Sequence, residues 1–145
     1  YKQLSLKGMR ALVAEDNELN MEIVKFILEE QGLIVEPAVD GIEAVRKFEN
    51  APPGYYQVIL MDIMMPNMNG WDAARKIRAM QRADAGVIPI IAMSANAFTE
   101  DIINSRISGM NRHLTKPLDA SKLLDEIAKA ISILPGSAQS VHQEK

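Results

Sequence analysis

The sequence predicts an α/β fold, in which one domain is built on a doubly wound, five-stranded parallel sheet with helices on both faces. Five short apolar segments alternate with five segments of helical periodicity, and this order is typical of parallel strands joined by right-handed crossover helices. The apolar run Val58–Met61 shows no alternation with polar residues, as expected for a strand that is covered on both faces. A chain of 145 residues, 48% of them hydrophobic, suits one domain of this kind.

The first half of the chain is predicted to form two strand–helix units. Asn17 or Asp16 can cap the first helix, Gly32 can end it, and Asp40 with Gly41 opens the second. The predicted elements are a strand over Met9–Ala14, a helix over Glu18–Gln31, a strand over Leu33–Pro37 and a helix over Gly41–Asn50. Helical spacing predicts an apolar stripe on each helix. We assign these stripes to Leu19, Ile23, Phe26, Ile27 and Glu30 in the first helix, and to Ile42, Val45 and Phe48 in the second.

The second half of the chain continues the alternation with three more strands and three more helices. The predicted elements are strands over Val58–Asp62, Val87–Met93 and Arg112–Thr115, and helices over Gly70–Met80, Thr99–Ser108 and about 119–134. Pro89 interrupts the fourth strand, so its buried part is predicted to be Ile90–Met93. The fifth strand is the most polar, which suits a sheet edge. Gly109 ends the fourth helix, and Asp119 or Ser121 caps the last.

Charged and polar side chains stand where the predicted strands end. They are Glu15 and Asp16 after the first strand, Asp62 after the third, Ser94 after the fourth and Lys116 after the fifth. Because open parallel sheets bind ligands at the carboxyl ends of their strands, we expect these side chains to meet at one edge. Three carboxylates repel one another, and a hard divalent cation would relieve that repulsion. No His or Cys spacing suggests zinc, so Mg²⁺ or Mn²⁺ is the predicted metal.

This set of side chains indicates phosphoryl transfer. A carboxylate beside Mg²⁺ can attack a phosphoryl group to give an acyl phosphate, which makes Asp62 the candidate nucleophile. Lys116 would offset charge on the phosphoryl oxygens, and Ser94 could donate a hydrogen bond to one of them. Taken singly, these residues have structural explanations: helix caps for the acids, a strand-end hydroxyl for Ser94 and a solvated amine for Lys116. Their joint occurrence at successive strand ends favours the functional interpretation.

The amino-acid composition indicates which partners and which cellular compartment to expect. The chain has a net charge of -3 and lacks the concentrated basic surface that nucleic-acid binding needs, so no direct nucleic-acid contact is predicted. The absence of cysteine is compatible with a reducing cytoplasm, and the apolar runs are too short to cross a bilayer, so a cytoplasmic domain without membrane contact is predicted. The chain begins at Tyr1 rather than Met, which fits a fragment of a longer protein that could itself be membrane-anchored. Residues 1–8 are predicted to be a leader and 135–145 a disordered tail.

Five segments resemble the receiver domain of bacterial two-component response regulators in their order and spacing. They read VAEDNELN, VDGIEAV, ILMDIMMPNMNGWDAARKIR, IIAMSAN and LTKP. The resemblance covers residues 9–134 and implies a flavodoxin-like receiver fold with strand order 2-1-3-4-5. The implied roles are phosphoacceptor for Asp62, direct Mg²⁺ ligand for Asp16, ligand through water for Glu15, backbone-carbonyl ligand for Met64, switch hydroxyl for Ser94, phosphate-pairing amine for Lys116, and a cis peptide bond before Pro117.

The resemblance also implies a phosphorylation-activated signalling switch in a phosphorelay. The donor would be a phosphohistidine on a histidine kinase or a histidine phosphotransfer domain, docked by the first helix and the loops at the site. The candidate contacts are Met21, Ile63, Met65 and Pro66, although Met21 could equally belong to the core. The output face would be formed by residues 99–134, through which a homodimer could also form. Such a domain promotes its own phosphorylation and dephosphorylation without being a turnover enzyme on its own.

The segments AEDNELN and MDIMMPNMNG are most similar in sequence to receivers at the C-terminus of hybrid sensor histidine kinases. The alternatives are a stand-alone response regulator and a docking module that works independently of phosphorylation. Two other classes are disfavoured. A haloacid-dehalogenase-like phosphatase needs a second Asp where this chain has Met64, and a nucleotide-binding domain needs a Gly-rich loop after the first strand.

Three residues are expected to tune the switch. Many receivers have Tyr or Phe where this chain has His113, three residues before the lysine. His113 is either an ordinary half-exposed residue of an edge strand or a group that makes the switch weaker or pH-sensitive. Met64 and Asn96 lie two residues beyond Asp62 and Ser94, at positions that flank the phosphorylation site in receivers. Since Met64 cannot activate a water molecule, a long-lived phosphoryl group is predicted.

Overall fold

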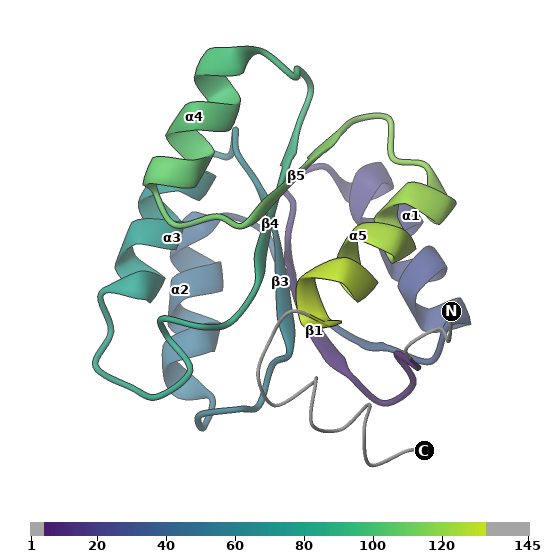
Figure 1. The fold of residues 1–145 in the computed structure, drawn as a ribbon, viewed down its shortest axis with the longest axis horizontal. Helices are drawn as coiled ribbons and strands as arrows, with labels where there is room; N and C mark the ends of the chain where they lie inside the picture. The colour runs from purple at the N-terminus through teal and green to yellow at the C-terminus, as the bar shows by residue number, and fades with distance from the viewer. Residues whose placement is uncertain (1–4, 133–145) are drawn as a thin grey trace.

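The computed structural model describes residues 5–132, which form a parallel sheet in the order β2-β1-β3-β4-β5. The strands are β1 (Arg10–Ala14), β2 (Ile34–Ala38), β3 (Val58–Asp62), β4 (Ile90–Ser94) and β5 (Arg112–Thr115). The helices are α1 (Glu18–Glu30), α2 (Gly41–Asn50), α3 (Gly70–Arg78), α4 (Thr99–Ile107) and α5 (Ala120–Ser132). Strands and helices alternate along these residues (Figure 1), so the predicted doubly wound α/β fold and its strand order are confirmed.

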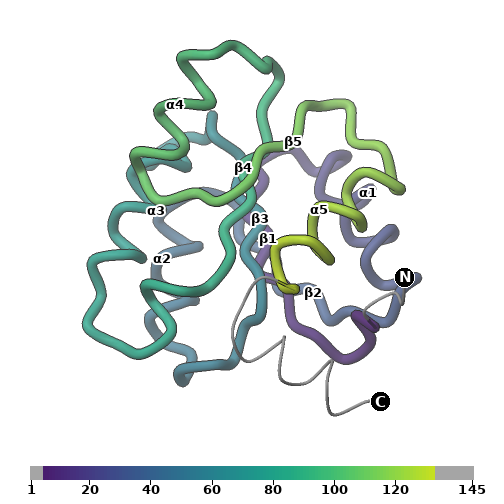
Figure 2. Tube along the Cα trace, in the orientation of Figure 1, coloured from purple at the N-terminus to yellow at the C-terminus, as the bar shows by residue number. Residues whose placement is uncertain are grey.

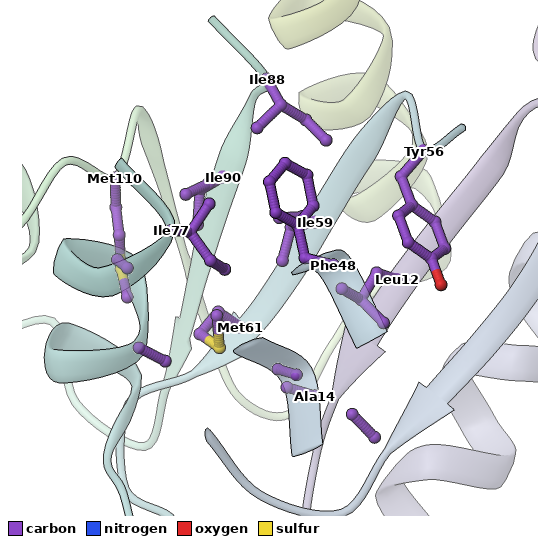
Figure 3. Close-up of a cluster of buried hydrophobic side chains, with 14 of the residues drawn as sticks. Leu12, Ala14, Phe48, Tyr56, Ile59, Met61, Ile77, Ile88, Ile90 and Met110 are labelled. Atoms are coloured by element: carbon purple, nitrogen blue, oxygen red, sulfur yellow. The ribbon is translucent and has the colours of Figure 1, made fainter. Parts of the chain in front are cut away.

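Helices cover both faces of the sheet. In Figure 1, α2, α3 and α4 lie on one side of the strands and α1 and α5 on the other. Figure 2 shows β1 and β3 between these two layers. One core packs α2 and α3 against the sheet, with Leu12, Phe48, Ile59, Met61, Ile77 and Ile90 among its side chains (Figure 3). The other core packs α1 and α5 against the opposite face, with Val13, Val24, Leu28, Leu60, Ile91, Leu123 and Ile127.

β3 is the central strand, and its position brings the predicted site residues to one edge. Its residues alternate between the two cores, which explains why its sequence is apolar throughout. It pairs in parallel with β1 and with β4, so that Asp62 lies opposite Met93. Because all the strand pairs are parallel, the carboxyl ends of the strands face the same way.

The apolar stripe predicted for α1 is wrong, because most of it faces solvent. The exposed residues are Leu19, Ile23, Phe26 and Glu30, and the buried ones are Met21, Val24 and Leu28. Leu19 is 69% exposed and Phe26 is 67% exposed. Both sets recur every three or four residues, so spacing alone could not decide which of them meets the sheet. Ile27 lies at the margin of the core, where it is half-buried.

The predicted stripe on α2 is wrong at one position and correct at the others. Ile42 is exposed, and Ala44 points inward with Phe48 instead. Ala44 passes unnoticed in the sequence because a methyl group adds little to an apolar pattern. Its small size lets α2 pack closely against α3 and β1.

The predicted helix ends are largely confirmed. The Asn17 side chain accepts a hydrogen bond from Asn20 N at the start of α1, and Asp119 does the same for Lys122 N at the start of α5. Gly32 follows α1 with a positive φ. α3 ends at Arg78, two residues earlier than predicted, and β2 begins and ends one residue later than predicted.

Some predictions fall at the ends of the chain. The end of the last helix at Leu134 and the tail over 135–145 lie outside the described residues. Of the predicted leader, residues 5–8 are described, and Leu6 is buried in the core beneath α1 and α5. None of the helices within residues 5–132 has the length and hydrophobicity that a membrane crossing requires.

Candidate functional site

Three carboxylates meet at the carboxyl end of the sheet, as the sequence predicts. Glu15 and Asp16 follow β1, and Asp62 is the last residue of β3. One oxygen from each lies within 4.8 Å of the others. Glu15 and Asp62 are buried, with 2% and 4% of their surface exposed, whereas Asp16 is exposed to solvent. The cluster therefore has two acids set into the sheet and one at its surface.

Lys116 joins this cluster from the end of β5. Its Nζ lies 2.7 Å from Glu15 Oε1 and 3.1 Å from Asp62 Oδ2. The peptide bond between Lys116 and Pro117 is cis, as predicted. The backbone N–H of Lys116 donates to the carbonyl of Ser94 at 2.7 Å, which holds the start of this loop against β4. The predicted convergence of three acids and one amine is thus confirmed in the geometry.

The electrostatics of the cluster disfavour a charged Asp62. Burial, followed by the nearby Glu15 carboxylate, raises the pKa of Asp62 to about 7, although Lys116 acts in the opposite direction. For Lys116, burial lowers the pKa, but its contacts with Glu15 and Asp62 outweigh burial and raise it. Oε1 of Glu15 is buried, and its partner within the described part of the chain is the Lys116 ammonium. One ammonium group does not balance three carboxylates.

The loop after β3 is held by contacts that the sequence did not reveal. Asn67 adopts a left-handed conformation, with φ of 68°, and its side chain donates to Asp40 at 2.8 Å. Gly70 starts α3 against the backbone of Asp62, and a Cβ atom there would lie 2.2 Å from the Asp62 carbonyl oxygen. Gly41 approaches the Met68 carbonyl in the same way. The only signal in the sequence was the Asn and Gly content of the segment, which predicts a turn.

Ser94 lies at the end of β4, where its hydrogen-bond partners are groups other than the carboxylates. Its side chain is buried and donates to the carbonyl of Asn96, and its Oγ lies 2.8 Å from Nε2 of His113 on β5. No hydrogen bond joins Ser94 to Asp62 within residues 5–132. Three further residues named from the sequence are exposed: Met64, Asn96 and Pro117.

This geometry agrees with the comparison with known protein families. Residues 11–128 match the family described as the response regulator receiver domain. The match spans most of the chain and includes the three acids, Ser94 and Lys116. The chain belongs to the response regulator receiver domain family. It is therefore a receiver domain of a two-component phosphorelay.

Several relatives of this receiver domain are histidine kinases. It is 34% identical over 121 residues to the peroxide stress-activated histidine kinase mak1 of Schizosaccharomyces pombe, covering 83% of this chain and 7% of the kinase. It is also 34% identical over 133 residues to probable histidine kinase 2 of Oryza sativa subsp. indica, covering 84% of this chain and 13% of the kinase. The chain thus spans only a small part of these curated relatives.

A solved structure is similar to this receiver domain in both fold and sequence. It is the receiver domain of the sensor histidine kinase PA1611 from Pseudomonas aeruginosa, which has a magnesium ion coordinated in its active site cleft. The two are 36% identical with a TM-score of 0.78, and the alignment covers 86% of this chain and 98% of that one.

The donor set of this receiver domain fits a divalent cation. Three carboxylates and one ammonium carry two more negative charges than positive ones when all are ionised, which a divalent cation would balance. All the candidate side-chain ligands are oxygens, which Mg²⁺ prefers. Asp16 is exposed, so a cation bound here could keep water molecules in its shell. The acidic cluster and its chemistry therefore agree with the predicted metal.

Proposed function

We propose that Asp62 accepts a phosphoryl group from a phosphohistidine and that the domain acts in the cytoplasm as a phosphorylation-activated switch. The observation that carries this proposal is the meeting of three carboxylates and Lys116 at the end of β3. A carboxylate oxygen of Asp62 would attack phosphorus, the bond from phosphorus to the imidazole nitrogen would break with its electron pair kept by nitrogen, and the imidazole would take up a proton from solvent and leave as the neutral ring. An acyl phosphate on Asp62 would remain.

Each neighbouring group has a role in this proposal. Asp16, Glu15 through water, Asp62 and the Met64 carbonyl would hold the cation, which when bound supplies positive charge to the phosphoryl oxygens. Lys116 would pair with the phosphoryl group, and the 3.1 Å contact between its Nζ and Asp62 supports this role. Ser94 would turn from its present partners to donate to a phosphoryl oxygen. That movement would shift the loop before α4 and change the face formed by residues 99–134.

The function is tested by intact mass after incubation with Mg²⁺ and a small acyl-phosphate donor. We expect the chain to gain one phosphoryl group, on the peptide that contains Asp62, and to gain none when the cation is chelated. Loss of the group on treatment with hydroxylamine would identify it as an acyl phosphate. A chain that stays unmodified with both an acyl phosphate and a phosphohistidine donor would contradict the proposal and favour a docking module independent of phosphorylation.

The exposed apolar face of α1 is the surface that we propose for docking the donor. Leu19, Ile23 and Phe26 are all exposed, although helix faces turned to water are usually polar. Ile23 also lines a small cavity with Asn20, Lys116, Pro117 and Leu118, beside the site. Of the donor contacts named from the sequence, Met21 and Ile63 are buried and cannot take part, whereas Pro66 is exposed and Met65 half-buried.

Replacing Phe26, which is 67% exposed on this face, with Asp is expected to slow phosphoryl transfer from a phosphorylated histidine kinase by about tenfold, because a charge would be placed in an apolar contact. Phosphorylation by a small acyl phosphate should keep its rate, since the catalytic groups are untouched. Ile103→Asp on α4 is the matched control, because Ile103 is 50% exposed and lies on a different helix. Equal slowing by both variants, or slowing with the small donor as well, would contradict this assignment of the docking face.

The lifetime of the phosphoryl group is predicted to be long, because Met64 offers no group that activates water. Its side chain is 73% exposed two residues after Asp62, where it can screen the acyl phosphate. Met64→Asn is expected to shorten the lifetime several-fold by placing a polar group there. The decay is followed by intact mass after removal of the donor in the presence of Mg²⁺. Loss from the wild-type chain within seconds would show that Met64 gives no protection.

We further propose that this domain is part of a hybrid histidine kinase, which its similarity to kinases such as mak1 supports. Sequencing of the complete reading frame tests this proposal, and a frame that codes for a receiver alone would favour a stand-alone regulator. A homodimer through residues 99–134 stays a prediction. Sedimentation of the phosphorylated and unphosphorylated chain tests it.

A further inference from the structure

The hydroxyl of Ser94 has two hydrogen-bond partners but only one proton to donate. The carbonyl oxygen of Asn96 is an acceptor only, so Ser94 donates its single proton there. Nε2 of His113 lies 2.8 Å from the same Oγ and must therefore supply the proton of the second hydrogen bond. His113 thus donates to Ser94 through a protonated Nε2, and the hydroxyl is fixed from two sides.

We propose that His113 is a positioning residue that holds Ser94 in its unphosphorylated arrangement and opposes the switch. This inference rests on the proposed function, in which Ser94 turns to a phosphoryl group on Asp62. To do so, Ser94 must give up its bond to Asn96, and a move away from β5 also breaks the bond to His113. A tyrosine or phenylalanine at this position would have no ring N–H to offer. The hydrogen bond therefore stabilises the unphosphorylated state alone and lowers the population of the active state.

The hydrogen bond from His113 to Ser94 does not require a charged imidazole. Burial lowers the pKa of His113, while Asp101 on α4 acts in the opposite direction. The other charged groups around the same cavity are Arg106 on α4 and Arg112 on β5, of which Arg112 is paired with Glu126 on α5. Both the Nε2–H tautomer and the imidazolium carry a proton on Nε2, so either form can bind Ser94. Of the alternatives that the sequence left open for His113, the hydrogen bond thus favours a weaker switch, without a need for pH sensitivity.

His113 is also placed to transmit the change to α4. It lines the cavity between β5 and α4 together with Ile102 and Ser105. Ser105 is the buried residue of α4, and its hydroxyl accepts a hydrogen bond from Trp71 Nε1 at 3.0 Å. Trp71 is the only tryptophan of the chain. Its indole N–H therefore reports movement of α4 against α3.

The test compares variants by their affinity for beryllium trifluoride, a mimic of the phosphoryl group, in the presence of Mg²⁺. Binding is followed by the chemical shifts of the backbone amides and of the Trp71 indole N–H. His113→Phe keeps a ring but loses the donor, so it should bind the mimic about two- to tenfold more tightly than the wild type. His113→Gln restores an N–H donor and should stay within about twofold of the wild type. In a Ser94→Ala background, His113→Phe should have no effect, because the bond is already absent.

Three results would overturn the proposal: unchanged or weaker binding by His113→Phe, equal tightening by His113→Gln, or tightening that persists in the Ser94→Ala background. Intact mass after incubation with an acyl phosphate tells a failure of this proposal from a failure of the proposed function. If the proposed function fails, the wild-type chain gains no phosphoryl group at all. In that case the hydrogen bond between His113 and Ser94 is tested in the unmodified protein by nitrogen NMR of the imidazole. A proton on Nε2 that exchanges faster in Ser94→Ala supports the proposal, and a neutral ring without a proton on Nε2 overturns it.

Discussion

Replacing Asp62 with asparagine is expected to abolish phosphorylation and, without a divalent cation, to make the folded domain more stable at about pH 8. The first effect follows because an amide cannot form the acyl phosphate. The second follows because Asp62 is buried beside the Glu15 carboxylate, and the Lys116 ammonium offsets only part of the repulsion. An uncharged amide of the same shape removes that repulsion and the cost of burying the charge. We expect the free energy of unfolding to rise by about 1–4 kcal/mol.

The pH dependence of this gain follows from the pKa of Asp62. In the folded domain this pKa is about 7, against an ordinary value of 3.8. Between the two values the folded state keeps a proton that the unfolded chain has lost, and this stabilises the wild type. That contribution is fully present below the lower value and is lost as the pH rises through about 7. The advantage of Asp62→Asn should therefore be absent in acid, grow across this interval and stay constant above it.

Urea unfolding of both chains at a series of pH values, with the cation chelated, measures this difference. Glu22→Gln is the matched control, because it makes the same chemical change on an exposed part of α1. Added Mg²⁺ should stabilise the wild type more than Asp62→Asn, because the variant lacks one of the proposed ligands. A variant that is less stable than the wild type at every pH would show that Lys116 fully compensates the charge of Asp62.

The sequence was most informative where chemistry and chain direction act together. The acids after β1 and β3 and the lysine after β5 were predicted to meet, because parallel strands fix where their ends lie. Spacing was less informative for helix faces. α1 carries more apolar residues than one buried face needs, and only the position of the sheet decides that Val24 is buried and Phe26 exposed. Leu19, Ile23 and Phe26, which were wrongly predicted to face the core, are the residues now proposed to dock the donor.

Contacts between side chains of different strands could not be predicted from the sequence. His113 was recognised as unusual for its position, but its bond to Ser94 depends on the register of β4 and β5. The contact of Trp71 with Ser105 likewise needs the relative placement of two helices. Such contacts require the two atoms to be placed to within a few tenths of an ångström, whereas a sequence pattern specifies only which face of an element a residue occupies.

Adding a single methyl group at Gly70 is expected to damage both the fold and the site. The Cβ atom of Gly70→Ala would lie 2.2 Å from the backbone carbonyl oxygen of Asp62, and a backbone atom cannot move aside as the end of a side chain can. α3 or the end of β3 must therefore shift. We expect the free energy of unfolding to fall by about 1–3 kcal/mol. Helix propensity acts the other way, because alanine favours a helix over glycine by about 1 kcal/mol, so a loss would show that the close approach dominates.

Gly86→Ala is the matched control for this change, because a Cβ atom there meets nothing within 4 Å. Its free energy of unfolding should stay within about 0.5 kcal/mol of the wild type. Since the carbonyl displaced in Gly70→Ala belongs to the proposed phosphoacceptor, its rate of phosphorylation by an acyl phosphate should also fall, even where the variant is fully folded. Equal stability and equal rates for the two variants would mean that the loop after β3 adapts freely. The site would then depend on the end of β3 alone and not on the packing of α3 against it.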